Sequence, residues 1–149
     1  MAQFDNRNNS EFGLALSAVL SGVTPAAGAW MDMRGWGSLT LAVSTGVVTD
    51  AGAAGGFVFE VQESDTTAAA DATAVADADL IGTEAALTVT VDADDNKQIG
   101  TIGYRGSKRY VRIVATGTTG TDAAAHVQAI KGNGSIMGTA SIDAGTAAT

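Results

Sequence analysis

The sequence contains no cysteine, one proline and one histidine in 149 residues. The absence of cysteine excludes a disulfide framework and thiolate chemistry. A histidine-based metal site would need carboxylates as all its other ligands, and Gly-x-Ser-x-Gly, the nucleophile elbow of many serine hydrolases, does not occur. We therefore expect a protein that is not an enzyme and needs no cofactor or metal, with His126 an ordinary strand residue.

Basic residues and long apolar runs are also scarce. There are 8 Lys and Arg residues against 16 Asp and Glu residues, which gives a net charge of -8. Nucleic-acid binding is not expected, because it depends on neutralising phosphates. No run of about 18 apolar residues could cross a membrane. The apolar stretch at residues 14–20 is too short for a signal peptide and follows charged residues, so we expect no membrane partner and no Sec export.

Small and β-branched residues fill most of the chain, and such residues favour strands and turns over helices. The central stretch is Gly56–Asp65, in which Phe57, Phe59 and Val61 alternate with more polar positions. A period of two indicates a strand with one buried face. Similar alternation recurs about eight times between glycine-rich or polar breaks. The sequence therefore predicts an all-β fold of about eight antiparallel strands, as a sandwich or a barrel.

The alternation also predicts which side chains face the core. Leu14 is expected to share the inner face with Leu16 and Leu20, and Val47 with the residues of the strand at 38–48. This strand and the Phe57 strand are predicted to form an antiparallel hairpin with a long glycine-rich loop. The expected core consists of Leu39, Leu41, Val43, Phe57, Phe59, Val61, Leu87, Val89, Val91, Val111 and Ile113.

Three segments are expected along the chain. Residues 1–12 are polar and rich in asparagine, and are predicted to form an N-terminal arm. Residues 13–134 form the β domain, with a long acidic excursion at 64–86 that contains a short helix near residues 74–80. Residues 135–149 form a tail rich in Gly, Ala and Thr.

The charges are unevenly distributed. Arg105, Lys108, Arg109 and Arg112 are four of the eight basic residues and lie within eight positions. Ten of the sixteen acidic residues lie between Glu60 and Asp95. This basic run is either a solvated hairpin tip or one half of a complementary charge pairing, within the fold or between subunits.

The two tryptophans form a second distinctive feature. Trp30 and Trp36 flank Asp32 and Arg34. The simplest interpretation is a short strand and turn that anchor the core. The alternative is a binding patch, because tryptophan is enriched at interfaces.

Three stretches together resemble a known family. They are FVFEVQESD at residues 57–65, VADADLIG at 75–82 and IGYRGSKRYVR at 102–112. In this order they resemble small structural proteins of tailed bacteriophages, in particular head decoration proteins. The resemblance spans roughly residues 30–131, and none of its motifs is catalytic.

The resemblance implies a jelly-roll-like β-sandwich that assembles as a symmetric oligomer, with a trimer matching the local threefold positions of a capsid. It further implies a structural virion protein that is made in the host cytoplasm, binds the major capsid protein outside the capsid and stabilises it by bridging capsomers. The alternative is another β-rich virion component, such as a tail-tube, fibre or receptor-binding module.

The residues expected to make these contacts come from three regions. The arm is the expected main anchor, because a polar segment can become ordered on binding. The basic run is the expected contact with another subunit or with the capsid lattice, and the tryptophans are a further candidate patch. The contact residues are Phe4, Asn6, Arg7, Phe12, Trp30, Trp36, Arg105, Lys108, Arg109 and Arg112.

Overall fold

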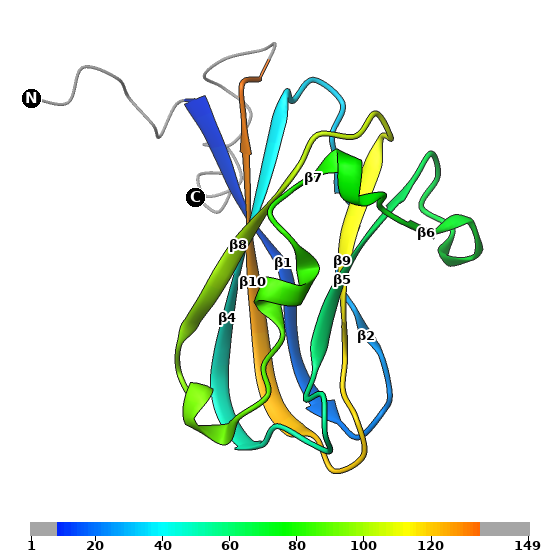
Figure 1. Ribbon diagram of the computed structural model, residues 1–149. Coiled ribbons are helices and arrows are strands. Elements are labelled where there is room, and N and C mark those ends of the chain that lie inside the picture. The colour runs from blue at the N-terminus through cyan, green and yellow to red at the C-terminus, as the bar shows by residue number, and fades with distance from the viewer. Residues whose placement is uncertain (1–8, 135–149) are drawn as a thin grey trace, which may run out of the picture.

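The computed structural model describes residues 9–134, which form two antiparallel β-sheets packed face to face (Figure 1). Sheet A has the strand order β1-β10-β4-β8-β7, and sheet B has the order β2-β9-β5-β6, with β3 also paired to β9. The strands are β1 (Ser10–Ser21), β2 (Ala26–Ala27), β3 (Met31–Asp32), β4 (Ser38–Asp50), β5 (Val58–Ser64), β6 (Thr73–Ala74), β7 (Leu80–Ile81), β8 (Gln98–Tyr104), β9 (Tyr110–Thr116) and β10 (Asp122–Gly132).

The strands pair in a nested order. The first pairs with the last (β1 with β10), the short strands β2 and β3 pair with β9, β4 pairs with β8, and β5 pairs with β6. This is the pairing of a long hairpin wrapped into two sheets, which defines a jelly roll. The expected all-β sandwich of jelly-roll type is therefore confirmed.

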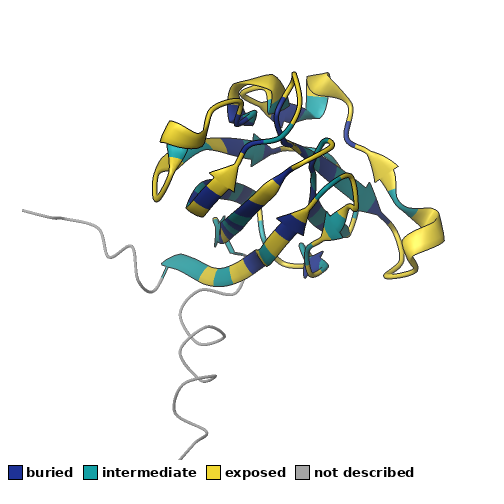
Figure 2. Ribbon diagram, turned by 90° about the horizontal axis from the view of Figure 1, so that it is seen from below, coloured by how far each residue is buried: buried dark blue, intermediate teal, exposed yellow. Residues whose placement is uncertain are grey.

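The core lies between the two sheets, and Figure 2 shows buried residues along the strands and exposed ones mainly in the connections. Phe57 and Phe59 are 0 % and 1 % exposed, and their rings meet edge to face with centroids 5.9 Å apart. Ten of the eleven predicted core residues are buried. Val91 is the exception, at 50 % exposed.

Leu87, Val89 and Val91, all expected in the core, do not lie on one strand. Leu87 ends the 3-10 helix η3 (Glu84–Leu87), and Val89 makes a single isolated bridge to Phe57. The chain then turns into the 3-10 helix η4 (Asp92–Asp94). Two inward-facing residues are therefore supplied by an irregular segment, and Val91 lies beyond them at the surface.

Two β-bulges change the predicted inner faces. In β1 an extra residue at Ala15 shifts the register against β10, so that Leu14 is 63 % exposed while Leu16 and Leu20 remain buried. In β4 an extra residue near Gly46 leaves Val47 61 % exposed and buries Val48 instead. A bulge places two residues opposite one, and the alternation therefore changes phase at that point.

The predicted hairpin between β4 and β5 is wrong, because β4 belongs to sheet A and β5 to sheet B. The glycine-rich connection crosses from one sheet to the other. Gly56 makes this crossing possible, since its φ is +63° and a Cβ there would lie 1.9 Å from the Val89 carbonyl oxygen. Only glycine fits both the conformation and the space.

The acidic excursion links the edges of the two sheets. After β5 the chain forms the 3-10 helix η1 (Ala69–Asp71), pairs with sheet B through β6, and reaches sheet A through the 3-10 helix η2 (Asp77–Asp79) and β7. The short helix expected near residues 74–80 is the single 3-10 turn η2. The excursion therefore closes one side of the sandwich.

Strand β1 begins at Ser10, inside the range 1–12 that was expected to form an arm. Phe12 is thus a strand residue, opposite Ile130 of β10, with 57 % of its surface exposed. Phe4, Asn6 and Arg7 lie outside the described residues, as does the predicted tail at 135–149.

Candidate interaction site

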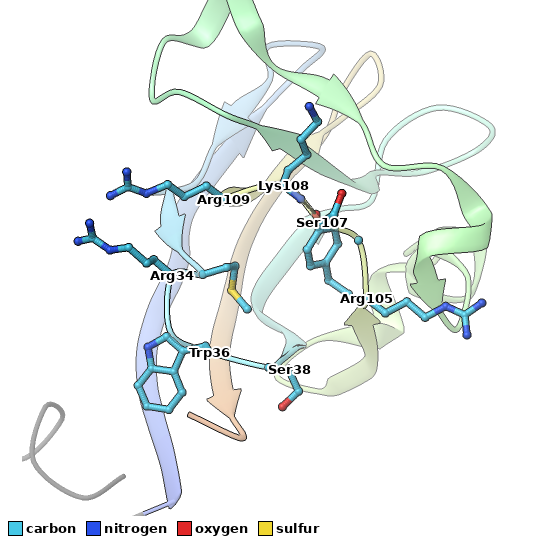
Figure 3. A pocket seen from close by; sticks show the side chains of 11 residues that line it. Arg34, Trp36, Ser38, Arg105, Ser107, Lys108 and Arg109 are labelled. Carbon is cyan, nitrogen blue, oxygen red and sulfur yellow. Dashed lines mark hydrogen bonds between the residues drawn. The ribbon is translucent and has the colours of Figure 1, made fainter. Parts of the chain in front are cut away.

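A cavity of about 430 Å³ opens at one end of the sandwich, between the loop that follows β3 and the loop that joins β8 to β9 (Figure 3). The lining contains four cationic side chains and no carboxylate. In Figure 3, Arg34 and Arg109 extend toward the same side and Arg105 toward the other. The lining residues are Met33, Arg34, Trp36, Gly37, Ser38, Tyr104, Arg105, Gly106, Ser107, Lys108 and Arg109.

Tyr104 positions the loop between β8 and β9. Its hydroxyl donates a 2.6 Å hydrogen bond to Glu63 Oε2 and accepts a 2.9 Å bond from the backbone N–H of Lys108. Burial, followed by the bond to the Glu63 carboxylate, raises the pKa of Tyr104 well above its usual value. The hydroxyl therefore stays protonated as a donor. Gly106 permits this arrangement, because a Cβ there would lie 2.5 Å from the hydroxyl oxygen.

Arg109 forms a forked ion pair with Asp32. Arg109 Nη2 lies 2.8 Å from Asp32 Oδ2, and Nε lies 3.2 Å from Oδ1. This pair lowers the pKa of Asp32 to about 2. The backbone N–H of Met33 also donates a 2.7 Å bond to the Arg109 carbonyl oxygen. The two loops that form the cavity are therefore joined by backbone as well as side-chain contacts.

The other two cations of the β8–β9 loop contact the acidic excursion. Lys108 Nζ pairs with the Asp65 carboxylate, whose hydrogen bond raises the pKa of Lys108. Arg105 Nε donates a 2.9 Å bond to the carbonyl oxygen of Ala78. Pairing of the basic run with the acidic region within the fold, one of the expected alternatives, is therefore confirmed for Lys108. Arg109 pairs with Asp32, which lies outside that region.

Arg34 is a highly accessible cation of the cavity. Its side chain is 75 % exposed, and its Nη2 lies 4.0 Å from Asp32 Oδ2, at the limit for an ion pair. Asp32 is already held by the fork of Arg109. Arg34 is therefore available for a contact outside the chain.

The predicted site residues fall into separate groups. Arg105, Lys108, Arg109 and Trp36 come together at the cavity. Arg112 lies instead on β9 of sheet B, with its guanidinium 4.4 Å from the ring centre of Trp30 and its Nε 2.9 Å from Gln62 Oε1.

Lys131 of β10 also lies near the cavity. Its Nζ is 5.2 Å from the ring centre of Trp36 and 2.8 Å from Glu11 Oε1. Trp36 therefore combines a cavity-lining surface with a cation stacked on its ring.

Within residues 9–134, no group of three or more His, Asp and Glu side chains could hold a metal ion. His126 lies on β10 as expected, with its Nδ1 3.1 Å from the Ser17 hydroxyl. No helix in that range is long and apolar enough to span a membrane.

Sequence reasoning missed Met33, Arg34 and Tyr104 as members of the site. Arg34 was noted only as a residue between the tryptophans, and Tyr104 was not considered as a site residue. The sequence signal for Tyr104 was its position directly before the basic run, since a residue that begins a loop often fixes the conformation of that loop.

Comparison with known proteins supports the fold. No family model matches the sequence, and no curated protein matches it. Among solved structures, the exported protein XepA of PBSX aligns with a TM-score of 0.53 and 15 % identity, over 84 % of this chain and 38 % of XepA. This chain thus spans well under half of XepA, and the likeness, at this identity, concerns the fold alone.

Two further structures align more weakly. The SPBc2 prophage-derived protein YomS has a TM-score of 0.41 at 12 % identity, over 82 % of this chain and 93 % of YomS. A Bacillus endospore appendage protein of disulfide-linked pili has a TM-score of 0.35 at 9 % identity, over 89 % of this chain and 96 % of that chain.

Proposed function

We propose that this chain is a non-enzymatic structural component of a phage virion that binds the outside of the capsid and stabilises it by bridging capsomers. The jelly-roll fold and the family resemblance of residues 57–65, 75–82 and 102–112 support the assignment to a virion. The major capsid protein is the proposed partner. The proposed mechanism is mechanical, since added interface area between capsomers raises the barrier to their separation.

The observation that carries the proposal is the charge of the cavity at the end of the sandwich. The chain has a net charge of -8, yet the lining of this cavity holds four cations and no carboxylate. Arg109 and Lys108 are paired with Asp32 and Asp65 outside the lining, so the attraction for an anion comes chiefly from Arg34 and Arg105. A concave surface lined by one sign of charge attracts the opposite sign. The cavity therefore suits an acidic segment on the capsid surface, with the highly exposed Arg34 as a contact.

The cavity is also held in a fixed shape before binding. Tyr104, the forked pair of Arg109 with Asp32, and the ion pair of Lys108 with Asp65 join the cavity loops to each other and to sheet B. Rigid contact residues lose little conformational freedom on binding. This fits a protein that must remain attached to a shell.

Capsids that lack the protein provide the test. The purified chain and an Arg34→Glu variant are added, and the bound fraction is measured by co-sedimentation at several salt concentrations. Binding by the unmodified chain should fall as salt increases, and Arg34→Glu should weaken binding at low salt by about tenfold. Lys97→Glu is the matched control, since it makes the same change of charge at a side chain that is 53 % exposed and paired with Asp94.

Equal binding by the Arg34→Glu and Lys97→Glu variants would show that the cavity is not the contact. Electron cryomicroscopy of complete particles locates the chain independently. Density on the tail rather than the head would replace the capsid proposal with the alternative of a tail-tube, fibre or receptor-binding component.

A further inference from the structure

The outer face of sheet A differs from the outer face of sheet B. Register and burial place the outward side chains of β1, β10, β4, β8 and β7 on one continuous surface. Apart from Asp50 and Asp122, which pair with each other at one end, this surface carries no Asp, Glu, Lys or Arg. Its positions are mostly Ala, Gly, Ser and Thr, and His126 is the single titratable group away from the end that holds Asp50 and Asp122.

Large apolar side chains stand on this face at both edges. Phe12, Leu14 and Val19 of β1 are 57 %, 63 % and 74 % exposed. Ile130 of β10 lies opposite Phe12, and Ile81 of β7, at the other edge of the sheet, is 61 % exposed. These exposed apolar residues are not isolated, because small uncharged residues connect them across the sheet. Contiguous surfaces of this kind mark interaction sites.

The outer face of sheet B provides the contrast within the same molecule. It presents Glu60 and Gln62 of β5 and Arg112 of β9, with Arg112 bonded to Gln62 and stacked on Trp30. That face is an ordinary polar surface, and the charged groups of Arg112 and Glu60 on it already have hydrogen-bond partners within the chain. The lack of charge is thus a property of sheet A and not of the whole chain.

We propose that the outer face of sheet A packs against a second copy of this chain. Two copies with a net charge of -8 each repel one another wherever their carboxylates approach. This face is where two copies can approach without bringing like charges together. The basic cavity lies at the end of the sandwich, so self-association leaves it free. The proposal does not depend on the proposed function.

The size of the face is adequate for a weak specific contact. Four strands about 4.8 Å apart and about eight residues long at roughly 3.4 Å per residue give roughly 500 Å² of flat area. Two such faces bury about 1,000 Å², near the lower limit for a specific protein interface. We therefore expect association that depends on concentration, with a dissociation constant in the micromolar range.

Analytical ultracentrifugation of the full chain between about 1 and 100 µM tests the proposal. The mean mass should rise with concentration, and Leu14→Lys and Val19→Lys should each raise the dissociation constant by about tenfold or more. Both side chains are already largely exposed, so the melting temperature should stay nearly constant. Val58→Lys is the control, because Val58 is a 42 % exposed strand residue outside sheet A and should not affect the mass.

The mass of the assembly also shows which surface the face meets. A dimer indicates that the face meets itself, whereas a ring such as a trimer indicates that it meets a different surface of the next copy. Either result supports the proposal if Leu14→Lys dissociates the assembly and Val58→Lys does not.

Two results would overturn the proposal. One is a monomer at every concentration, and the other is an assembly that Leu14→Lys and Val19→Lys leave intact. If the full chain is a monomer, a shortened chain that ends at Gly134 shows whether residues 135–149 occupy the face. If only this shortened chain associates, residues 135–149 of the same chain cover the face and a second copy is not its occupant.

Discussion

The Tyr104 hydroxyl donates a 2.6 Å hydrogen bond to the Glu63 carboxylate, and this bond joins the last residue of β8 in sheet A to β5 in sheet B. The same hydroxyl accepts a bond from the Lys108 backbone. One side-chain oxygen thus links both sheets to the loop that carries the basic run. The shape of the cavity is therefore coupled to the packing of the sandwich.

Tyr104→Phe should destabilise the protein by about 1–3 kcal/mol. The Glu63 carboxylate and the Lys108 backbone N–H would both lose their hydrogen-bond partner. Tyr104 is only 5 % exposed, so water cannot readily replace the hydroxyl. The free energy of unfolding from a urea titration measures the loss. Tyr110→Phe is the control, since Tyr110 is partly exposed and stacks beneath Arg109 through its ring. Equal losses in both variants would show that the Tyr104 bonds contribute nothing specific.

Phe59→Ala should cost about 3–5 kcal/mol, because Phe59 is 1 % exposed and packs against the ring of Phe57. Denaturant titration measures this change, and Val58→Ala, at an exposed position of the same strand, should cost far less. A loss below about 1 kcal/mol for Phe59→Ala would contradict the assigned inner face of β5.

The strands were predictable from the sequence because alternation is a local property. Leu39, Leu41 and Val43 face the core as expected. The exposure of Leu14 and Val47 was not predictable, because each depends on a bulge. A bulge depends on how two strands pair, and a single strand does not carry that information.

The assignment of strands to sheets was also beyond the local pattern. A glycine-rich connection permits a hairpin or a crossing between sheets, and β4 and β5 are joined by a crossing. The basic run was visible in the sequence, but the partner of Arg109 was not. Asp32 lies 77 positions away, and only the pairing of β3 with β9 brings the two side chains together.

Gly56→Ala should destabilise the protein more than Gly55→Ala. Both glycines have positive φ, +63° and +108°, so both substitutions introduce backbone strain of about 1–3 kcal/mol. A Cβ at Gly56 would also lie 1.9 Å from the Val89 carbonyl oxygen, whereas a Cβ at Gly55 meets nothing within 4 Å. The difference between the two melting temperatures therefore measures the clash. Identical melting temperatures would mean that the segment holding Val89 moves away freely and does not fix the crossing.

The stability supplied by the pair of Asp32 with Arg109 should disappear in acid. The pKa of Asp32 is lowered from 3.8 to about 2 in the folded state, chiefly by the hydrogen bond from Arg109. A lowered pKa means that the carboxylate stabilises the fold above its unfolded pKa, and that this contribution is lost as the pH falls through the folded value. Because the Asp32 side chain is 36 % exposed, solvent screening keeps the contribution modest.

Asp32→Asn isolates this effect when its unfolding free energy is compared with that of the unmodified chain across the acid range. The difference between the two proteins should be constant above the unfolded pKa of 3.8 and should shrink toward zero as the pH approaches about 2. Because both proteins contain Glu84, whose pKa burial raises, its opposite dependence on pH cancels in the difference. A difference that stays constant down to the lowest pH would show that Asp32 acts through the shape of the turn at Arg34, and not through its charge.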